Sequence, residues 1–263
     1  MNYAPNYVLK QRAKEQLSSN LGTVIGAFLL HMLCLVPVAF IMMLLPDNSF
    51  FMLVIVFIVN ILWDIYSSIF LTGENYVALT AAVRRTPMPT DVFMGFRGLV
   101  SKITLIRIVP ALLRTVAYIP VSIVYQRFTE ASESMDMAAF MTSYYNGDFE
   151  RALSIIEPII PLEMMMLVLG IVYFIICIII SIAYSQTLFI IHDYPDITAG
   201  EMVSLGFKVM KVQWGRYLYM QCSFILWDLA SFVTCGLSTI WVYPYKRIAY
   251  AEFYLDIMKG YRD

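Results

Sequence analysis

The strongest constraint on the fold is a series of apolar stretches, each about as long as a bilayer is thick. A helix needs about 20 mostly apolar residues to cross ~30 Å of hydrocarbon. We predict six transmembrane helices, over residues 21–45, 50–71, 103–124, 164–191, 217–233 and 237–258. Residues 46–49 and 234–236 leave room only for tight turns, so the spans are expected to pair as three hairpins. The expected fold is an all-α polytopic membrane helix bundle, with residues 1–263 forming a single membrane domain.

Composition excludes most soluble classes. The chain is 60% apolar and 14% charged, whereas soluble domains are about 45–50% apolar and about 25% charged. A soluble fold of this length could not bury so much apolar surface. The formal net charge of −1 also excludes a nucleic-acid binder that works through a general basic surface.

The first apolar stretch is expected to be an anchor helix and not a cleavable signal. At residues 21–45 it is longer than the 7–15 residues of a signal-peptide core, and it lacks a small-residue cleavage site.

Basic residues set the expected orientation, because Lys and Arg are retained on the cytoplasmic side of short loops. With both termini in the cytoplasm, the segments on that side hold Lys10, Arg12, Lys14, Arg84, Arg85, Arg97, Lys102, Lys208, Lys211, Arg216, Lys259 and Arg262. The only basic residues in the outer loop, residues 125–161, are Arg127 and Arg151. The sixth span is interrupted by charged side chains, so it depends on this bias more than on apolar length.

Amphipathic segments are expected to precede the hairpins. The clearest begins at Thr198 and Glu201, whose spacing predicts a capping box. Its apolar stripe is expected to contain Met202, Leu205, Val209 and Val212. A second is expected from Thr90 or Asp91, and a weaker one near the N-terminus, with Leu9 and Ala13 on its apolar side. Such segments either lie on an anionic leaflet or only position the next span.

Ionisable side chains inside spans are expensive, so each is a candidate for function. The candidate polar set is His31, Asp64, Arg107, Arg114, Asp228, Lys246, Arg247 and Glu252. Similar depth along the spans predicts that Asp228 pairs with Arg114 or Lys246, and His31 with Asp64. The set either ties helices together, or forms a proton relay or a polar cavity for the headgroup of an amphiphile. Since basic residues predominate, an anionic group is the expected ligand.

Catalytic and metal-binding patterns are missing from the sequence. It has no G-x-S-x-G, H-E-x-x-H or P-loop motif, so no catalytic residue is assigned. The four cysteines include no C-x-x-C pair, and the two histidines are 161 positions apart. We therefore expect no metal and no cofactor, and we expect a protein that is not an enzyme.

The second half of the chain carries a recognisable motif. It starts at the turn over residues 192–197 and continues through the basic helix and the last two spans. Its members include Asp193, Pro195, Lys208, Met210, Trp214, Trp227, Trp241, Pro244, Tyr245, Ala251, Phe253 and Tyr254. With weaker likeness upstream, the chain resembles the bacterial integral membrane family known as domain of unknown function 975. The resemblance implies a multi-span protein of the bacterial cytoplasmic membrane, with residues 125–161 as an insertion, and implies no activity.

The expected function is non-enzymatic binding, transport or protection that involves a small amphiphile, lipid or peptide. The alternative is a structural or regulatory partner of another membrane complex. A third class, an intramembrane lipid-modifying enzyme, would need a nucleophile and base that the sequence does not offer. The expected partners are the lipid bilayer, an anionic lipid or amphiphile and a membrane protein, but no nucleic acid.

Overall fold

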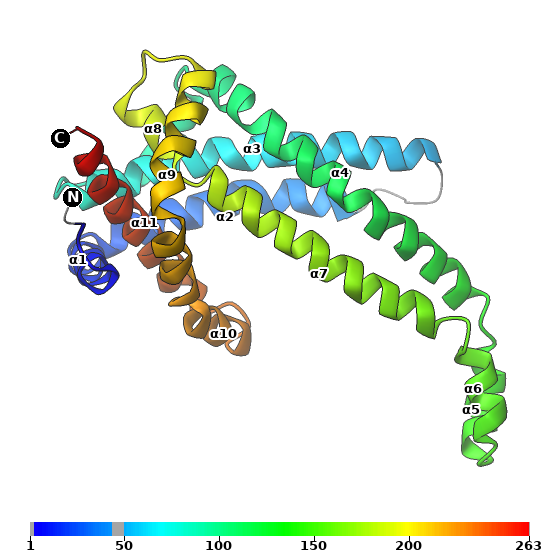
Figure 1. Cartoon of the computed structure of the whole chain (residues 1–263). Coiled ribbons are helices and arrows are strands. Elements are labelled where there is room, and N and C mark those ends of the chain that lie inside the picture. The colour runs from blue at the N-terminus through cyan, green and yellow to red at the C-terminus, as the bar shows by residue number, and fades with distance from the viewer. Residues whose placement is uncertain (1–2, 44–49, 263) are drawn as a thin grey trace. The chain divides into compact units, whose positions relative to one another are not determined.

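The computed structural model describes residues 3–43 and 50–262, and this part of the chain consists of helices and connecting segments without strands (Figure 1). The elements are α1 (Asn6–Ser19), α2 (Leu21–Met43), α3 (Phe50–Ala82), the 3-10 helix η1 (Pro89–Phe96), α4 (Val100–Glu133), α5 (Met137–Tyr145), α6 (Phe149–Ile156), α7 (Ile160–Ala183), α8 (Thr187–Asp193), α9 (Ala199–Cys222), α10 (Ile225–Val233) and α11 (Thr239–Arg262). The all-α prediction is confirmed. The predicted turn at 46–49 lies outside the described residues.

Four helices are long and apolar enough to cross a bilayer. Their apolar segments are Leu21–Val38 in α2, Val54–Ala82 in α3, Val100–Glu133 in α4 and Ile160–Asp193, which begins with α7. These segments correspond to the first four predicted spans. Among the described residues, no other helix meets the same criteria of length and composition.

The fifth and sixth predicted spans have a different local structure. The fifth was expected as one helix over 217–233, but α9 ends at Cys222 and α10 contains only nine residues. Nine residues rise about 13 Å, which is too short to cross the hydrocarbon core alone. The break coincides with Phe224, a fully buried ring that packs edge-on against Tyr245 with centroids 5.4 Å apart. Helix α11 is continuous from Thr239 to Arg262, but charged residues lower its hydropathy.

The predicted amphipathic segments are only partly as expected. The capping box is confirmed: the Thr198 amide donates to Glu201 Oε2 at 2.8 Å, and the Glu201 amide donates to Thr198 Oγ1 at 3.3 Å. Of the expected apolar stripe, Met202 and Val209 are buried, whereas Val212 is 79% exposed. The segment from Pro89 to Phe96 is a 3-10 helix, and Asp91 accepts from the Met88 amide at its start at 2.8 Å.

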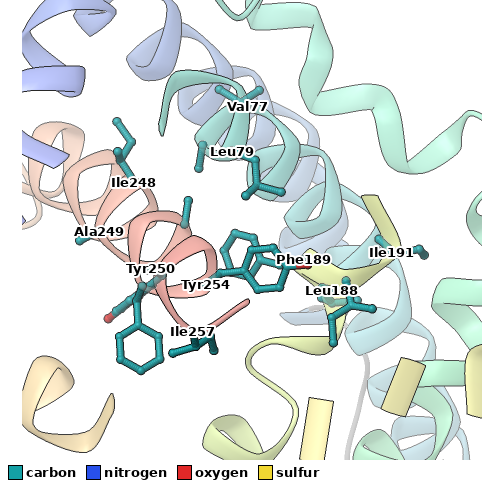
Figure 2. Packing of buried hydrophobic residues seen from close by; sticks show 14 of the residues in the cluster. Val77, Leu79, Leu188, Phe189, Ile191, Ile248, Ala249, Tyr250, Tyr254 and Ile257 are labelled. Atoms are coloured by element: carbon teal, nitrogen blue, oxygen red, sulfur yellow. The ribbon is translucent and has the colours of Figure 1, made fainter. Parts of the chain in front are cut away.

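The chain divides into two compact units, residues 1–111 with 181–263, and residues 112–180. The first unit contains the apolar core, which draws on α1, α3, α8, α9 and α11. In Figure 2 the rings of Phe189 and Tyr254 lie face to face, with centroids 5.4 Å apart. The Tyr254 hydroxyl also donates to Asp193 Oδ2 at 2.9 Å. Two residues of the sequence motif, Asp193 and Tyr254, therefore fix α8 against α11.

The second unit includes the predicted insertion, residues 125–161. Here α5 and α6 pack against each other as a short helical pair (Figure 1). Each helix begins with an aspartate cap: Asp136 Oδ1 accepts from the Ala139 amide at 2.9 Å, and Asp148 Oδ1 accepts from the Arg151 amide at 3.2 Å. These caps satisfy backbone amides that the helices leave unpaired.

Helix η1 lies directly on the backbone of α3, and two glycines make this approach possible. A Cβ added at Gly73 would lie 1.8 Å from the carbonyl oxygen of Val92. A Cβ added at Gly95 would lie 2.1 Å from the carbonyl oxygen of Ile69. Both obstructing atoms are backbone atoms, so they cannot move without displacing a helix.

We expect Gly73→Ala to lower the free energy of unfolding by about 3 kcal/mol, because η1 must move off α3. Gly215→Ala is the matched control, since no atom lies within 4 Å of its added Cβ. In the interior of α9 this change should raise stability by about 0.5–1 kcal/mol. Thermal unfolding in detergent micelles measures both effects. Equal midpoints for the two variants would contradict the close packing of η1 on α3.

Candidate functional site

A buried polar cluster joins three helices around the carboxylate of Glu74. His31 Nδ1 lies 2.6 Å from Glu74 Oε1, and the Tyr243 hydroxyl donates to Glu74 Oε2 at 2.7 Å. Arg247 Nη2 donates to the Tyr243 hydroxyl at 2.7 Å, and Arg247 Nε lies 3.6 Å from Glu74 Oε2. We call these four residues the Glu74 hub. His31 comes from α2, Glu74 from α3, and the other two from α11.

Local sequence explains how the hub forms. Tyr243 and Arg247 are four residues apart in α11, so they share one face of that helix. The Tyr243 ring packs against Phe28 with centroids 4.8 Å apart, and the His31 ring stacks on Phe70 at 5.3 Å. Apolar and aromatic neighbours thus exclude water from the hub. Glu74 and His31 are each only 4% exposed.

The hub has no room for a sizeable ligand. The cavity beside Glu74, Tyr243 and Arg247 has a volume of about 10 Å³, about the space that a single water occupies. His31 Nε2 has no hydrogen-bond partner among the described residues. The hub therefore ties α2, α3 and α11 together, which is the first of the two alternatives for these residues, and leaves no room for a headgroup.

Two further ion pairs account for four other candidates. Arg107 Nη2 of α4 donates to Asp64 Oδ1 of α3 at 2.9 Å. Lys246 Nζ of α11 lies 2.8 and 2.9 Å from the two carboxylate oxygens of Asp228 in α10. This is one of the two partners expected for Asp228. The remaining basic candidate, Arg114, lies on the part of α4 that belongs to the second unit.

The pairing of His31 with Asp64 is wrong, because His31 contacts Glu74. Sequence reasoning ended the second span at Leu71, where the apolar stretch ends, and so left Glu74 outside the membrane. Helix α3 continues to Ala82, three turns beyond Leu71, without a break. Thr72, Gly73 and Asn75 resemble a turn in sequence, so the absence of proline between residues 72 and 82 was the signal that could have placed Glu74 on the same helix.

A much larger cavity than the one at the hub lies between α1, the C-terminal end of α3 and α11. Its volume is about 450 Å³, and its charged lining residues are Arg12, Arg84, Glu252, Asp256 and Lys259. We call it the basic pocket. A neighbouring hollow of about 460 Å³ shares Arg84 and also contains Glu15 and Arg85.

One acidic residue of the basic pocket is neutralised within the protein. Arg216 Nη2 lies 2.5 Å from Asp256 Oδ2, and the amide of Ala4 donates to both carboxylate oxygens at 3.2 Å. These contacts also attach the start of the chain to α11. Asp256 therefore contributes little to the net charge that a ligand would meet.

The other charged groups of the pocket have no such partners. In residues 3–43 and 50–262, Arg12, Arg84 and Lys259 make no ion pair within 4.0 Å. Glu252 is 7% exposed and has no hydrogen-bond or ion-pair partner in the same part of the chain. Arg84 has a φ of +60°, which places its backbone in the left-handed region directly after α3. Its charge also complements the carbonyl end of that helix.

Only Glu252 of the eight sequence candidates lines the basic pocket. The three cations of the basic pocket are among the basic residues that predicted the orientation of the chain in the membrane. Sequence reasoning therefore treated them as signals of topology and not as parts of a site. They come from distant parts of the chain, at positions 12, 84 and 259. No local motif connects them.

Metal-ligand geometry is not found in the described ranges. Within residues 3–43 and 50–262, no three His, Cys, Asp or Glu side chains cluster closely enough to hold a metal ion. The four cysteines are free thiols.

The structure is therefore an all-helical protein with four helices long and apolar enough to cross a membrane, and its first unit contains both the Glu74 hub and the basic pocket. Comparison with protein families identifies the family of the chain. The family described as "Protein of unknown function (DUF975)" matches residues 1–260, and the chain belongs to this family. No curated protein and no solved structure matches it.

We expect Glu74→Gln to lower the free energy of unfolding by about 3 kcal/mol, because the change leaves Arg247, whose side chain is 21% exposed, without its negative partner. Glu15→Gln is the control, because Glu15 is exposed on α1 and its carboxylate accepts from the exposed Gln11 side chain at 3.3 Å. An exposed pair contributes about 1 kcal/mol or less. Thermal unfolding of the wild type and both variants, in nanodiscs of one lipid composition, measures both losses of stability. Similar losses for the two variants would contradict the central role of Glu74.

Proposed function

We propose that this protein is a non-enzymatic membrane protein that binds the anionic headgroup of an amphiphile in the basic pocket. The observation that carries this proposal is a cavity of about 450 Å³ with three cations that lack an ion-pair partner among the described residues. Unpaired Arg and Lys side chains around an open cavity favour a carboxylate, phosphate or similar group. Binding of this kind can serve transport or protection as well as sensing.

The apolar part of the pocket suits the rest of an amphiphile. Leu255 of α11 and Val83, just after α3, line the cavity beside the cations. Val83 is 49% exposed, so it offers an apolar contact at the rim. A headgroup can therefore occupy the charged end while its chain remains in the bilayer.

We also propose that the basic pocket faces the cytoplasm, in a six-span arrangement with both termini on that side. The three cations belong to the basic set that the positive-inside bias assigns to the cytoplasm. In α11, Lys246 and Arg247 are paired with Asp228 and Glu74 within the protein. Pairing lowers the cost of charges inside a membrane, which supports α11 as the sixth span. The cytoplasmic leaflet is also the leaflet richer in anionic lipid.

A structural or regulatory role remains the second candidate. It is favoured by the Glu74 hub and the Asp228–Lys246 pair, which satisfy intramembrane charges without a ligand. A purely structural protein does not need the unpaired cations of the basic pocket. The two candidates therefore predict different responses to anionic lipid.

Binding is tested with protein in nanodiscs of phosphatidylcholine, with or without an anionic lipid. We expect anionic lipid to raise the melting temperature, because a ligand that binds only the folded state stabilises it. Arg12→Gln and Lys259→Gln should each reduce this increase. Lys208→Gln is the matched control, since Lys208 is exposed on α9 and does not line the pocket. No lipid-dependent shift in the wild type would reject the binding function and favour the structural one.

Topology is tested by labelling single cysteines in cells, after the four native cysteines are replaced by alanine. A cysteine at Ser132 should react with a membrane-impermeant maleimide, because residues 125–161 are proposed to lie outside. A cysteine at Ser204 should react only after the membrane is opened. Both positions are exposed, so access to the side chain is not limiting. Labelling of position 204 in intact cells would overturn the proposed orientation.

A further inference from the structure

The charge of the basic pocket exceeds what a singly charged headgroup can neutralise. Three cations line it, Arg12, Arg84 and Lys259, and Glu252 carries the one carboxylate that lacks a partner. Asp256 is excluded from the sum because Arg216 neutralises it. With Glu252 ionised, three positive charges and one negative charge leave a net charge of +2.

We infer that the pocket selects a phosphate group of charge close to −2, as in a phosphomonoester headgroup, over a phosphodiester of charge −1. This inference rests on the proposed function and names the class of its ligand. A phosphomonoester carries about −1.5 to −2 at pH 7 because its second pKa is about 6. It can therefore balance the pocket, whereas a phosphodiester leaves one positive charge unmatched.

The protonation state of Glu252 does not reverse this preference. If the carboxyl group is protonated, the net charge of the pocket rises to +3 and the excess over a phosphodiester grows. The protonated carboxyl group can also donate a hydrogen bond to a phosphate oxygen. A side chain that is 7% exposed, without a partner and on the wall of a cavity, is placed to contact a ligand.

The neighbouring hollow does not change the charge balance. Apart from the shared Arg84, it contains one further cation, Arg85, and one carboxylate, Glu15. These two charges cancel. The hollow adds space beside the pocket for the remainder of a headgroup, while the net positive charge stays where Arg12, Arg84 and Lys259 converge.

The test compares two anionic lipids at equal total charge. Wild-type protein is placed in phosphatidylcholine nanodiscs that contain either phosphatidic acid, a phosphomonoester, or twice the mole fraction of phosphatidylglycerol, a phosphodiester. Native mass spectrometry counts bound lipid, and the melting temperature reports stabilisation. At about pH 8 we expect roughly fivefold tighter binding of phosphatidic acid, since one extra charge pair near a membrane surface contributes about that factor. At about pH 5, where the monoester is singly charged, this preference should disappear.

Variants distinguish a preference that depends on the net charge of the pocket from a general attraction between the protein and anionic lipids. Arg84→Gln lowers the net charge of the pocket to +1 and should remove the preference while phosphatidylglycerol still binds. Lys259→Gln makes the same change at an exposed side chain, so it serves if Arg84→Gln does not fold. Glu252→Gln should tighten the binding of both lipids, and Lys208→Gln should leave the preference unchanged.

The possible results test the doubly charged ligand and the proposed function separately. Equal binding of the two lipids to the wild type overturns the inference of a doubly charged ligand, but leaves the proposed function in place. A preference that persists in both Arg84→Gln and Lys259→Gln also overturns it. If neither lipid binds, the proposed function itself fails.

Discussion

The arrangement of α2, α3 and α11 depends on the contacts that the Glu74 carboxylate makes with His31, Tyr243 and Arg247. This carboxylate accepts from Tyr243, lies 2.6 Å from His31 Nδ1, and balances the charge of Arg247. A buried ion pair contributes little net stability by itself, but loss of one partner leaves an uncompensated charge in an apolar environment. The hub therefore specifies which helix faces meet. Because it holds α11 against α3, it also holds two walls of the basic pocket in place.

Sequence reasoning predicted the features that depend on local pattern. Apolar length identified the first four spans, and the spacing of Thr198 and Glu201 identified the start of α9. It was less successful where the structure depends on distant partners. The fifth span is broken beside Phe224, a residue that packs on another helix, and hydropathy does not reveal such a break. Val212 belongs to the same apolar stripe as Met202 in sequence, but it is 79% exposed where Met202 is buried.

In the candidate site, too, local pattern was visible in the sequence and the contacts between distant residues were not. Charged residues inside the spans stood out in sequence because they are rare there, but the structure pairs His31, Asp64, Arg107, Asp228, Lys246 and Arg247 with protein groups. The unpaired cations lie on α1, just after α3 and near the end of α11, in segments where basic residues are common in sequence. Tyr243 lies 169 residues after its acceptor Glu74, a distance over which no motif signals contact. Pairing, and not the presence of charge, separates structural ties from a binding site.

The basic pocket has a consequence for the order in which the protein becomes competent during synthesis. One wall comes from α1 and another from α11, and the contact of Ala4 with Asp256 joins positions 252 residues apart. Bacterial and other ribosomes add about 5–20 residues per second, so α1 precedes its partner by roughly 10–50 s. During this interval Arg12 and Arg84 are already made, but Lys259 and Glu252 are not. The nascent chain therefore has most of its apolar helices before it has a complete pocket, and the proposed ligand recognition is among the last properties it acquires.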